Sequence, residues 1–76
     1  MTFEITPTIH KNRHGEEVEV YFLCVVYPHV KLWLTREKQL SRDINKAGFL
    51  GSWSKCGLAM REIEQGKIRE GLAYGF

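Results

Sequence analysis

Residues 17–27, with the sequence EVEVYFLCVVY, decide the fold of this 76-residue chain. The stretch is rich in β-branched and aromatic residues and is therefore predicted to form a strand, which Pro28 and His29 end. Its uninterrupted apolar run, Tyr21–Tyr27, is seven residues long, whereas a helix that crosses a membrane needs about 20. We therefore expect no membrane partner.

Strands are also predicted on both sides of this stretch. Apolar residues alternate with polar ones from Thr2 to His10, which is the period-two pattern of a strand with one buried face. The residues Asn12–Gly15 include Asn and Gly and favour a hairpin turn. The residues Val30–Leu34 alternate again and predict a third strand.

The register of this sheet is predicted by keeping apolar residues on one side. Ile9 opposite Val18, and Val26 opposite Leu32, satisfy that condition. A one-residue slip would place Lys31 opposite Val26 and mix the two faces, so the slip is disfavoured. The predicted buried face consists of Phe3, Ile5, Ile9, Val18, Val20, Phe22, Cys24, Val26, Leu32 and Leu34.

The second half of the chain is predicted to be helical. Thr35 is the expected N-cap of a helix over residues 36–47, which Gly48 ends in a left-handed conformation. Ser52 is the expected N-cap of a second helix over residues 53–65, which Gly66 ends. The apolar stripe of the second helix is Trp53, Cys56, Met60 and Ile63. The last ten residues are expected to form an irregular apolar tail that packs back on the domain, with Ile68, Leu72, Tyr74 and Phe76.

The expected fold class is α+β in the order βββαα, a three-stranded antiparallel sheet whose apolar side two helices cover. Residues 1–76 are expected to form a single domain, because domains run from about 50 to 250 residues. The apolar fraction of 43% excludes a disordered chain. Without an N-terminal export signal or a CxxC spacing, a cytoplasmic protein with two free thiols is expected.

No group of residues predicts catalysis. The three histidines and the two cysteines do not have the paired spacing of a zinc site. The serines stand where helix capping or solvent exposure explains them, and no glycine-rich phosphate loop occurs. We therefore expect a protein that is not an enzyme and holds no metal and no cofactor.

The informative feature is the sheet face opposite the predicted core. An ordinary solvent-facing strand carries Thr, Lys, Glu and Ser, but this face carries aromatic and aliphatic side chains. Tyr and Trp suit interfaces because they bury a large area and keep a polar group. The sequence leaves two outcomes open: a partner or a second copy of the chain binds this face, or the second helix or the tail covers it. The predicted partner-binding residues are Tyr21, Leu23, Tyr27, Lys31 and Trp33.

The formal net charge of +2 conceals a basic segment. Residues 31–61 contain seven basic and two acidic residues, a net charge of +5. Three of the basic residues are four apart and would form a stripe on the first predicted helix, which could also be a solvated helix face. The predicted contacts to an anionic partner are Lys11, Arg13, Arg36, Lys38, Arg42 and Lys46.

Two functions fit these surfaces. The first is a small protein-binding regulator or inhibitor, as is common among mobile-element and regulatory proteins, which docks through the aromatic face. Its basic stripe would steer it to an acidic patch on the partner. The second is nucleic-acid binding, either through the sheet or through a helix-turn-helix made by the two helices. A steep salt dependence of binding would favour the second function.

Overall fold

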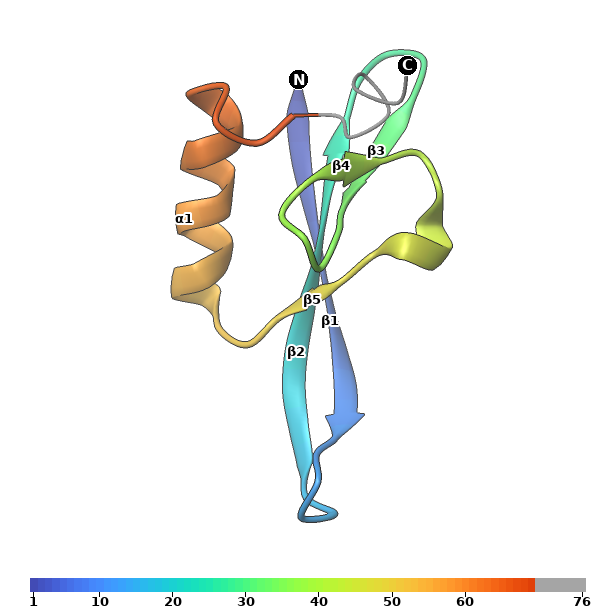
Figure 1. Ribbon diagram of the computed structural model, residues 1–76, viewed down its shortest axis with the longest axis vertical. Coiled ribbons are helices and arrows are strands. Elements are labelled where there is room, and N and C mark those ends of the chain that lie inside the picture. Colours follow the sequence, from blue (N-terminus) through green and yellow to red (C-terminus); the bar gives the residue numbers. More distant parts are fainter. Residues whose placement is uncertain (70–76) are drawn as a thin grey trace.

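An antiparallel sheet and one α-helix make up the part of the chain that the computed structural model describes, residues 1–69 (Figure 1). Strands β1 to β4 lie side by side in chain order, and β5 pairs with β2. The α+β class is thus confirmed, but the sheet has five strands and the described residues contain one α-helix instead of two. Ile68 of the predicted apolar tail packs in the core, and the rest of that tail, from residue 70, lies outside the described residues. The elements are β1 (Thr2–Lys11), β2 (Glu17–Val26), β3 (Lys31–Leu34), β4 (Leu40–Ser41), the 3₁₀ helix η1 (Ile44–Lys46), β5 (Phe49–Leu50) and α1 (Trp53–Glu64).

Asn12 holds the turn between β1 and β2 in place. Its Oδ1 accepts hydrogen bonds from the backbone N–H groups of His14 (2.9 Å) and Glu16 (3.0 Å). Its own backbone N–H donates to the Glu16 carbonyl at 2.9 Å. Gly15 has a φ of 79°, in the left-handed region that glycine adopts without a steric penalty. The paired residues Asn12 and Glu16 therefore enclose a loop of three residues, a common hairpin type in which a left-handed residue follows a type I turn.

This turn sets the β1–β2 register one residue away from the predicted one. Ile9 pairs with Glu19, whereas apolar matching favoured Ile9 opposite Val18. Because the loop holds an odd number of residues, the two members of every pair are both odd-numbered or both even-numbered. The prediction was wrong because β2 is apolar on both of its faces between Val20 and Val26, so apolar matching could not decide between them.

The register between β2 and β3 is also shifted by one residue. Val26 pairs with Lys31, the slip that apolar matching disfavoured. The two shifts together exchange the faces of β2 and leave those of β1 and β3 as predicted. Lys31 is tolerated opposite Val26, since its Nζ reaches the exposed Glu4 carboxylate at 3.3 Å.

Helix α1 covers one side of the sheet, which we call the helix face. Leu23 and Val25 lie there with no exposed surface, although they were predicted to lie on the opposite side. That opposite side, which we call the outer face, carries Phe22 and Cys24 of β2. The core on the helix face is formed by Leu23, Val25, Leu32, Leu34, Leu40, Ala59, Ile63 and Ile68.

Helix α1 begins and ends close to the predicted residues. Ser52 is its N-cap, and the Ser52 Oγ accepts a hydrogen bond from the Lys55 N–H at 3.3 Å. Gly66 follows the C-cap with a φ of 75°, as expected for a glycine that ends a helix. Cys56 and Ile63 are buried as predicted, but Trp53 is 60% exposed and does not belong to the buried stripe.

The predicted helix over residues 36–47 is wrong, because this segment forms a second hairpin turn, β4 and η1. Thr35 has the role that Asn12 has in the first turn: its Oγ1 accepts from the Gln39 N–H at 3.1 Å, and its N–H donates to the Gln39 carbonyl at 2.8 Å. Lys38 takes the place of Gly15, with a φ of 61°. A threonine oxygen that accepts a nearby backbone N–H serves a turn as well as a helix cap. The turn also pairs Leu40 with Leu34 and buries both.

Gly48 is required for a close backbone contact and not for a left-handed helix end. Its N–H donates to the Leu34 carbonyl at 2.9 Å, next to a bridge between Thr35 and Ala47. A Cβ atom at Gly48 would lie 2.6 Å from the backbone nitrogen of Arg36. The segment before β5 therefore packs directly on the second turn.

Beyond the pairing of Tyr21 with Leu50, β1 and β2 continue as a two-stranded arm, residues 8–20 (Figure 1). The molecule measures 40 Å along its longest axis, against 24 and 21 Å along the other two. Pro7 lies in β1 just before the arm. An edge strand tolerates proline where the missing N–H would point to solvent.

We expect Lys38→Gly to increase the free energy of unfolding by roughly 0.5–1 kcal/mol. Removing a Cβ from a left-handed residue relieves about 1–2 kcal/mol, and the greater freedom of glycine in the unfolded chain offsets part of this gain. Urea denaturation followed by circular dichroism measures the change. The exposed Lys11 in β1 provides the control, because Lys11→Gly should lower stability. A Lys38→Gly protein that is less stable than the parent would contradict the second turn.

We expect opposite effects of alanine at two glycines. Gly48→Ala should lower the free energy of unfolding by roughly 1–3 kcal/mol, because the new Cβ would clash with backbone atoms that cannot move independently. Gly57→Ala should increase it by roughly 0.5–1 kcal/mol, because Gly57 lies in α1 with no atom within 4 Å of the new Cβ. Thermal unfolding of both variants tests the pair, and a neutral Gly48→Ala would show that the close contact is absent.

Candidate protein-binding surfaces

The outer face of the sheet contains a groove of about 340 Å³ with apolar walls, which we call the aromatic groove. Its volume lies at the lower end of the range for ligand pockets, about 300–1,000 Å³. The residues that line it are Thr6, Phe22, Trp33, Ile44 and Ala47.

Strand pairing and a capped turn position these side chains. Thr6 pairs with Phe22 across β1 and β2, and Trp33 pairs with Ser41 across β3 and β4. The Asp43 carboxylate accepts from the Asn45 N–H at 2.9 Å and caps η1. This cap holds Ile44 over the groove, with 58% of Ile44 exposed.

Phe49 extends this apolar surface toward the arm. The centroid of its ring lies 4.6 Å from that of the His10 ring and 6.4 Å from that of the Phe22 ring. The two phenylalanine rings meet edge to face. Such pairs are separated by about 4.5–7 Å in favourable arrangements. Phe49 remains 41% exposed, so the cluster is only partly covered by the protein itself.

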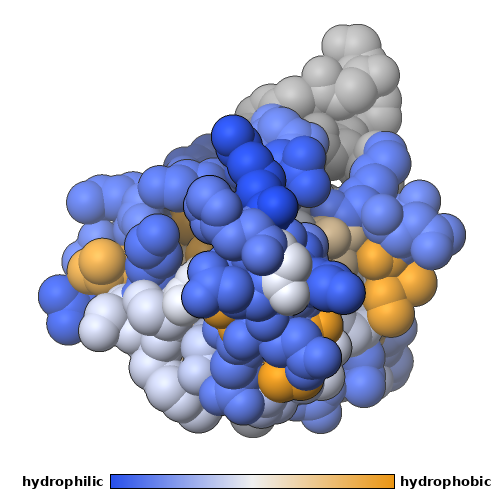
Figure 2. All heavy atoms as spheres, turned by 90° about the horizontal axis from the view of Figure 1, so that it is seen from below, coloured by the Kyte–Doolittle hydropathy of each residue, from blue (hydrophilic) through white to orange (hydrophobic). Residues whose placement is uncertain are grey.

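The apolar surface is divided into small areas. Figure 2 looks along the arm from below and shows a mostly hydrophilic surface with separate hydrophobic areas. The exposed large apolar side chains come from different elements, such as Ile9 on the arm, Ile44 in η1 and Leu58 in α1. Within residues 1–69, these three exposed side chains belong to separate elements and do not lie on one strand face.

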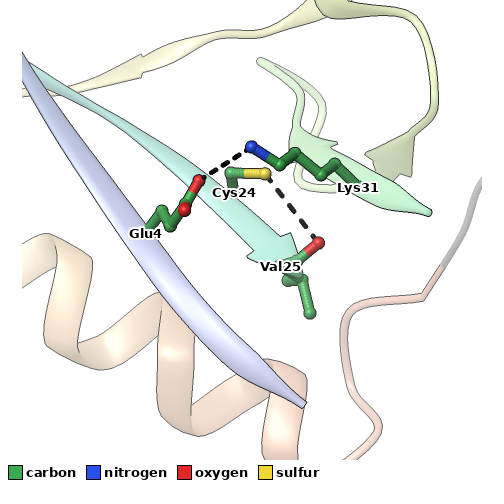
Figure 3. Close-up of polar contacts among 4 residues, drawn as sticks. All are labelled: Glu4, Cys24, Val25 and Lys31. Atoms are coloured by element: carbon green, nitrogen blue, oxygen red, sulfur yellow. Dashed lines mark hydrogen bonds and ion pairs between the residues drawn. The ribbon is translucent and has the colours of Figure 1, made fainter. Parts of the chain in front are cut away.

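An ion pair crosses β2 above Cys24 on the outer face (Figure 3). Lys31 on β3 and Glu4 on β1 approach to 3.3 Å, and both side chains are about half exposed. An exposed pair of this kind contributes little to stability, typically 0–1 kcal/mol. Cys24 was predicted to lie in the core beside Phe3, but it is buried on the other side of the sheet, between Glu4 and Trp33.

The predicted partner-binding residues do not share one face. Lys31 and Trp33 lie on the outer face, whereas Leu23 is in the core and Tyr21 is buried on the helix face beside Trp53, with the ring centroids 5.2 Å apart. Tyr27 is half-buried and packs against the core. The exchange of the β2 faces separates these residues, so Leu23 is not available as a surface contact.

A hydrogen bond also occupies the polar end of Tyr21. Its hydroxyl donates to the Glu19 carboxylate at 2.7 Å. This hydrogen bond and burial raise the pKa of Tyr21 above its ordinary value. The tyrosine thus stabilises the junction between the arm and α1 and is not presented to solvent.

The six predicted cationic contacts lie in three places, and the predicted helix stripe of Lys38, Arg42 and Lys46 does not form. Lys11 and Arg13 are at the tip of the arm, where Lys11 pairs with Glu17 in the ladder. Arg36 and Lys38 lie in the second turn. Arg42 and Lys46 lie two residues before and two residues after Ile44 in the sequence. The stripe was wrong because it assumed a helix over residues 36–47. The helix-turn-helix arrangement is wrong for the same reason.

Sequence reasoning missed Phe22 and Ile44, which line the aromatic groove, and Phe49, which extends its apolar surface. Phe22 was assigned to the core by the register argument, and Ile44 to the buried side of a helix that does not form. Phe49 stood in a short apolar connection that received no role. The available signal was the excess of apolar residues over what a single small core uses.

No three His, Cys, Asp or Glu side chains in residues 1–69 lie close enough together to hold a metal ion. No helix in the same residues is both long enough and apolar enough to cross a membrane.

Comparisons of the chain with protein-family models, with curated proteins and with solved structures found no significant match. The surfaces are therefore interpreted from their own geometry.

Both cysteines are buried and unpaired with each other, and burial is the main cause that raises the pKa of each thiol. In the unfolded chain these thiols ionise at their ordinary pKa of about 9, while the folded chain keeps them protonated. Their contribution to stability is therefore complete below that pH and is lost as the pH rises. We expect the free energy of unfolding, measured in urea, to fall between about pH 8 and pH 9.5.

Cys24→Ala and Cys56→Ala provide the controls, since each should remove part of that pH dependence. Native alkylation by iodoacetamide, followed by mass spectrometry, should be slow at both thiols and become fast in urea. Rapid alkylation of the folded protein, or stability that is constant over this pH range, would contradict the burial of the thiols.

Proposed function

We propose that this protein is a small, non-enzymatic binding module, a regulator or inhibitor, that docks on a protein partner through the aromatic groove. The observation that carries the proposal is the position of Ile44, which a capped 3₁₀ turn holds 58% exposed over a groove lined by Phe22 and Trp33. An aliphatic side chain left exposed next to half-buried aromatic rings is typical of a contact that a partner completes.

The aromatic groove alone is too small for a stable interface. Burying an Ile or a Phe side chain completely contributes about 1.5–3 kcal/mol, and association costs at least about 4 kcal/mol. Ile44 and Phe49 alone would therefore give weak binding. A stable interface buries about 800 Å² on each partner, so it would include Phe49 and His10 as well as the residues around η1.

The charges next to Ile44 in the sequence favour a partner with an acidic rim. Arg42 and Lys46 lie two residues before and two residues after Ile44, while the Asp43 carboxylate accepts the hydrogen bond that caps η1. Rim charges of this kind act mainly on the association rate and on partner choice. The rim thus replaces the helix stripe as the basic part of the proposed interface.

A protein is a better candidate partner than a nucleic acid, because the arm is a poor match for DNA. The arm could enter a groove of duplex DNA as a two-stranded ribbon, but its cations Lys11 and Arg13 stand among three carboxylates, those of Glu16, Glu17 and Glu19. Phosphate binding depends on neutralisation by several cations, which this arm lacks. An oligonucleotide titration at low salt tests the alternative, and tight binding there would favour nucleic acid.

We expect Ile44→Asp to abolish capture of the partner from a lysate of the source organism. Ile9→Asp is the matched control, because Ile9 is 60% exposed, lies on the arm and should leave capture unchanged. Ile44→Asp should change the free energy of unfolding by less than about 0.5 kcal/mol, because Ile44 is exposed. Ile9→Asp should lower it by up to about 1 kcal/mol, because the new carboxylate lies opposite Glu19, so the folding of both variants is checked by urea denaturation. The measurement is quantitative mass spectrometry of proteins retained by each immobilised variant.

Two results would contradict this proposal. One is a partner that Ile44→Asp still retains as well as the parent protein does. The other is concentration-dependent dimerisation in sedimentation that Ile44→Asp removes, which would make a second copy of the chain the occupant of the groove.

A further inference from the structure

A crevice of about 400 Å³ lies between α1, the second turn and β5. It shares no lining residue with the aromatic groove. Leu58 on α1 is 56% exposed and forms one side of its apolar floor. We call this site the basic crevice. The apolar lining residues are Leu34, Phe49, Leu50, Leu58, Ala59 and Ile68.

Cations stand on both walls of the basic crevice. Arg36 and Lys38 belong to the wall formed by the second turn, and Lys55 belongs to the wall formed by α1. Glu62 is the only carboxylate among the lining residues. Within residues 1–69, none of the three cations forms an ion pair. Their charge is therefore not neutralised by the described part of the protein.

We propose that the basic crevice binds an acidic protein segment that inserts an apolar side chain between two sets of carboxylates. The apolar floor selects an aliphatic or aromatic side chain. Cations on both walls match a ligand with negative charge on both sides of that side chain, whereas a fatty acid or a similar amphiphile has its charge at one end only. The basic crevice and the aromatic groove share no lining residue, although Phe49 of the crevice also borders the groove. Variants at residues other than Phe49 therefore let either proposal fail without the other.

Glu62 makes the two ends of the basic crevice differ in charge. Lys55 and Glu62 are seven residues apart and lie on the same side of α1, so the helix wall changes from positive to negative along the crevice. The bound carboxylates should therefore lie toward the Lys55 end. Removing the Glu62 charge should strengthen binding.

The probe is a fluorescein-labelled peptide, Gly-Glu-Glu-Leu-Glu-Glu-Gly, titrated with the full chain at about 0.15 M ionic strength, where distant charges are screened, and followed by fluorescence anisotropy. We expect Lys55→Glu and Arg36→Glu each to weaken binding by roughly three- to ten-fold, and Glu62→Gln to strengthen it about two-fold. Leu58→Ala should weaken it by roughly three-fold or more, through the lost apolar contact. The same peptide with glutamines or with a central glycine should bind more weakly than the probe.

Matched variants separate this site from non-specific attraction. Lys11→Glu makes the same charge change at the tip of the arm and should leave peptide affinity within about two-fold. Ile9→Ala is the control for Leu58→Ala, because the two side chains are similarly exposed. Ile44→Asp should not change peptide binding, which distinguishes a failure here from a failure of the aromatic groove.

Four outcomes would overturn the inference. The probe could fail to bind at about 1 mM, a weak limit on the affinity scale. Lys11→Glu could weaken binding as much as Lys55→Glu does. The glutamine peptide could bind as tightly as the acidic one. A single-stranded oligonucleotide could displace the probe and itself depend on Lys55, which would assign the crevice to nucleic acid.

Discussion

The length of the loop that Asn12 closes is the constraint on which the rest of the sheet depends. One side-chain oxygen accepts two backbone N–H groups, and together with the left-handed Gly15 this holds the loop at three residues. An odd loop pairs odd residues with odd ones along the whole ladder, so it decides which face of β2 meets α1. A two- or four-residue loop would exchange those faces and place Phe22 and Cys24, instead of Leu23 and Val25, under the helix.

How much of the fold could be predicted depends on how many local signals agree. Helix α1 was predictable because a serine cap, a buried stripe and a closing glycine all point to the same boundaries. Strand β2 was equally clear, but its register was not, since its apolar residues satisfy either parity and only the turn distinguishes them. The failure at residues 36–47 has another cause: a lysine occupies the left-handed position of the second turn, where glycine would have revealed a hairpin.

The prediction of the binding surfaces failed in one defined way. The excess of aromatic and aliphatic residues was recognised correctly, but the exchanged faces of β2 moved most of it into the core and brought Phe22 next to Trp33 instead. The basic residues also differ in arrangement from the predicted helix stripe. Residues 36–47 form a turn, β4 and η1, so that Arg36 and Lys38 line the basic crevice, while Arg42 and Lys46 flank Ile44 in the sequence.

The two surfaces are built from the same short segments on opposite sides of the sheet. Trp33 lines the aromatic groove and its neighbour Leu34 lines the basic crevice, because consecutive side chains of a strand point to opposite faces. The Gly48 N–H donates a hydrogen bond to the Leu34 carbonyl. This one backbone contact holds the segment before β5 against the strand that contributes to both the aromatic groove and the basic crevice. The described chain has one α-helix, and it covers one face. Among residues 1–69, η1 is the helical element that partly covers the outer face. A partner seated on Phe22 and Trp33 would supply a second layer over the apolar part of this face.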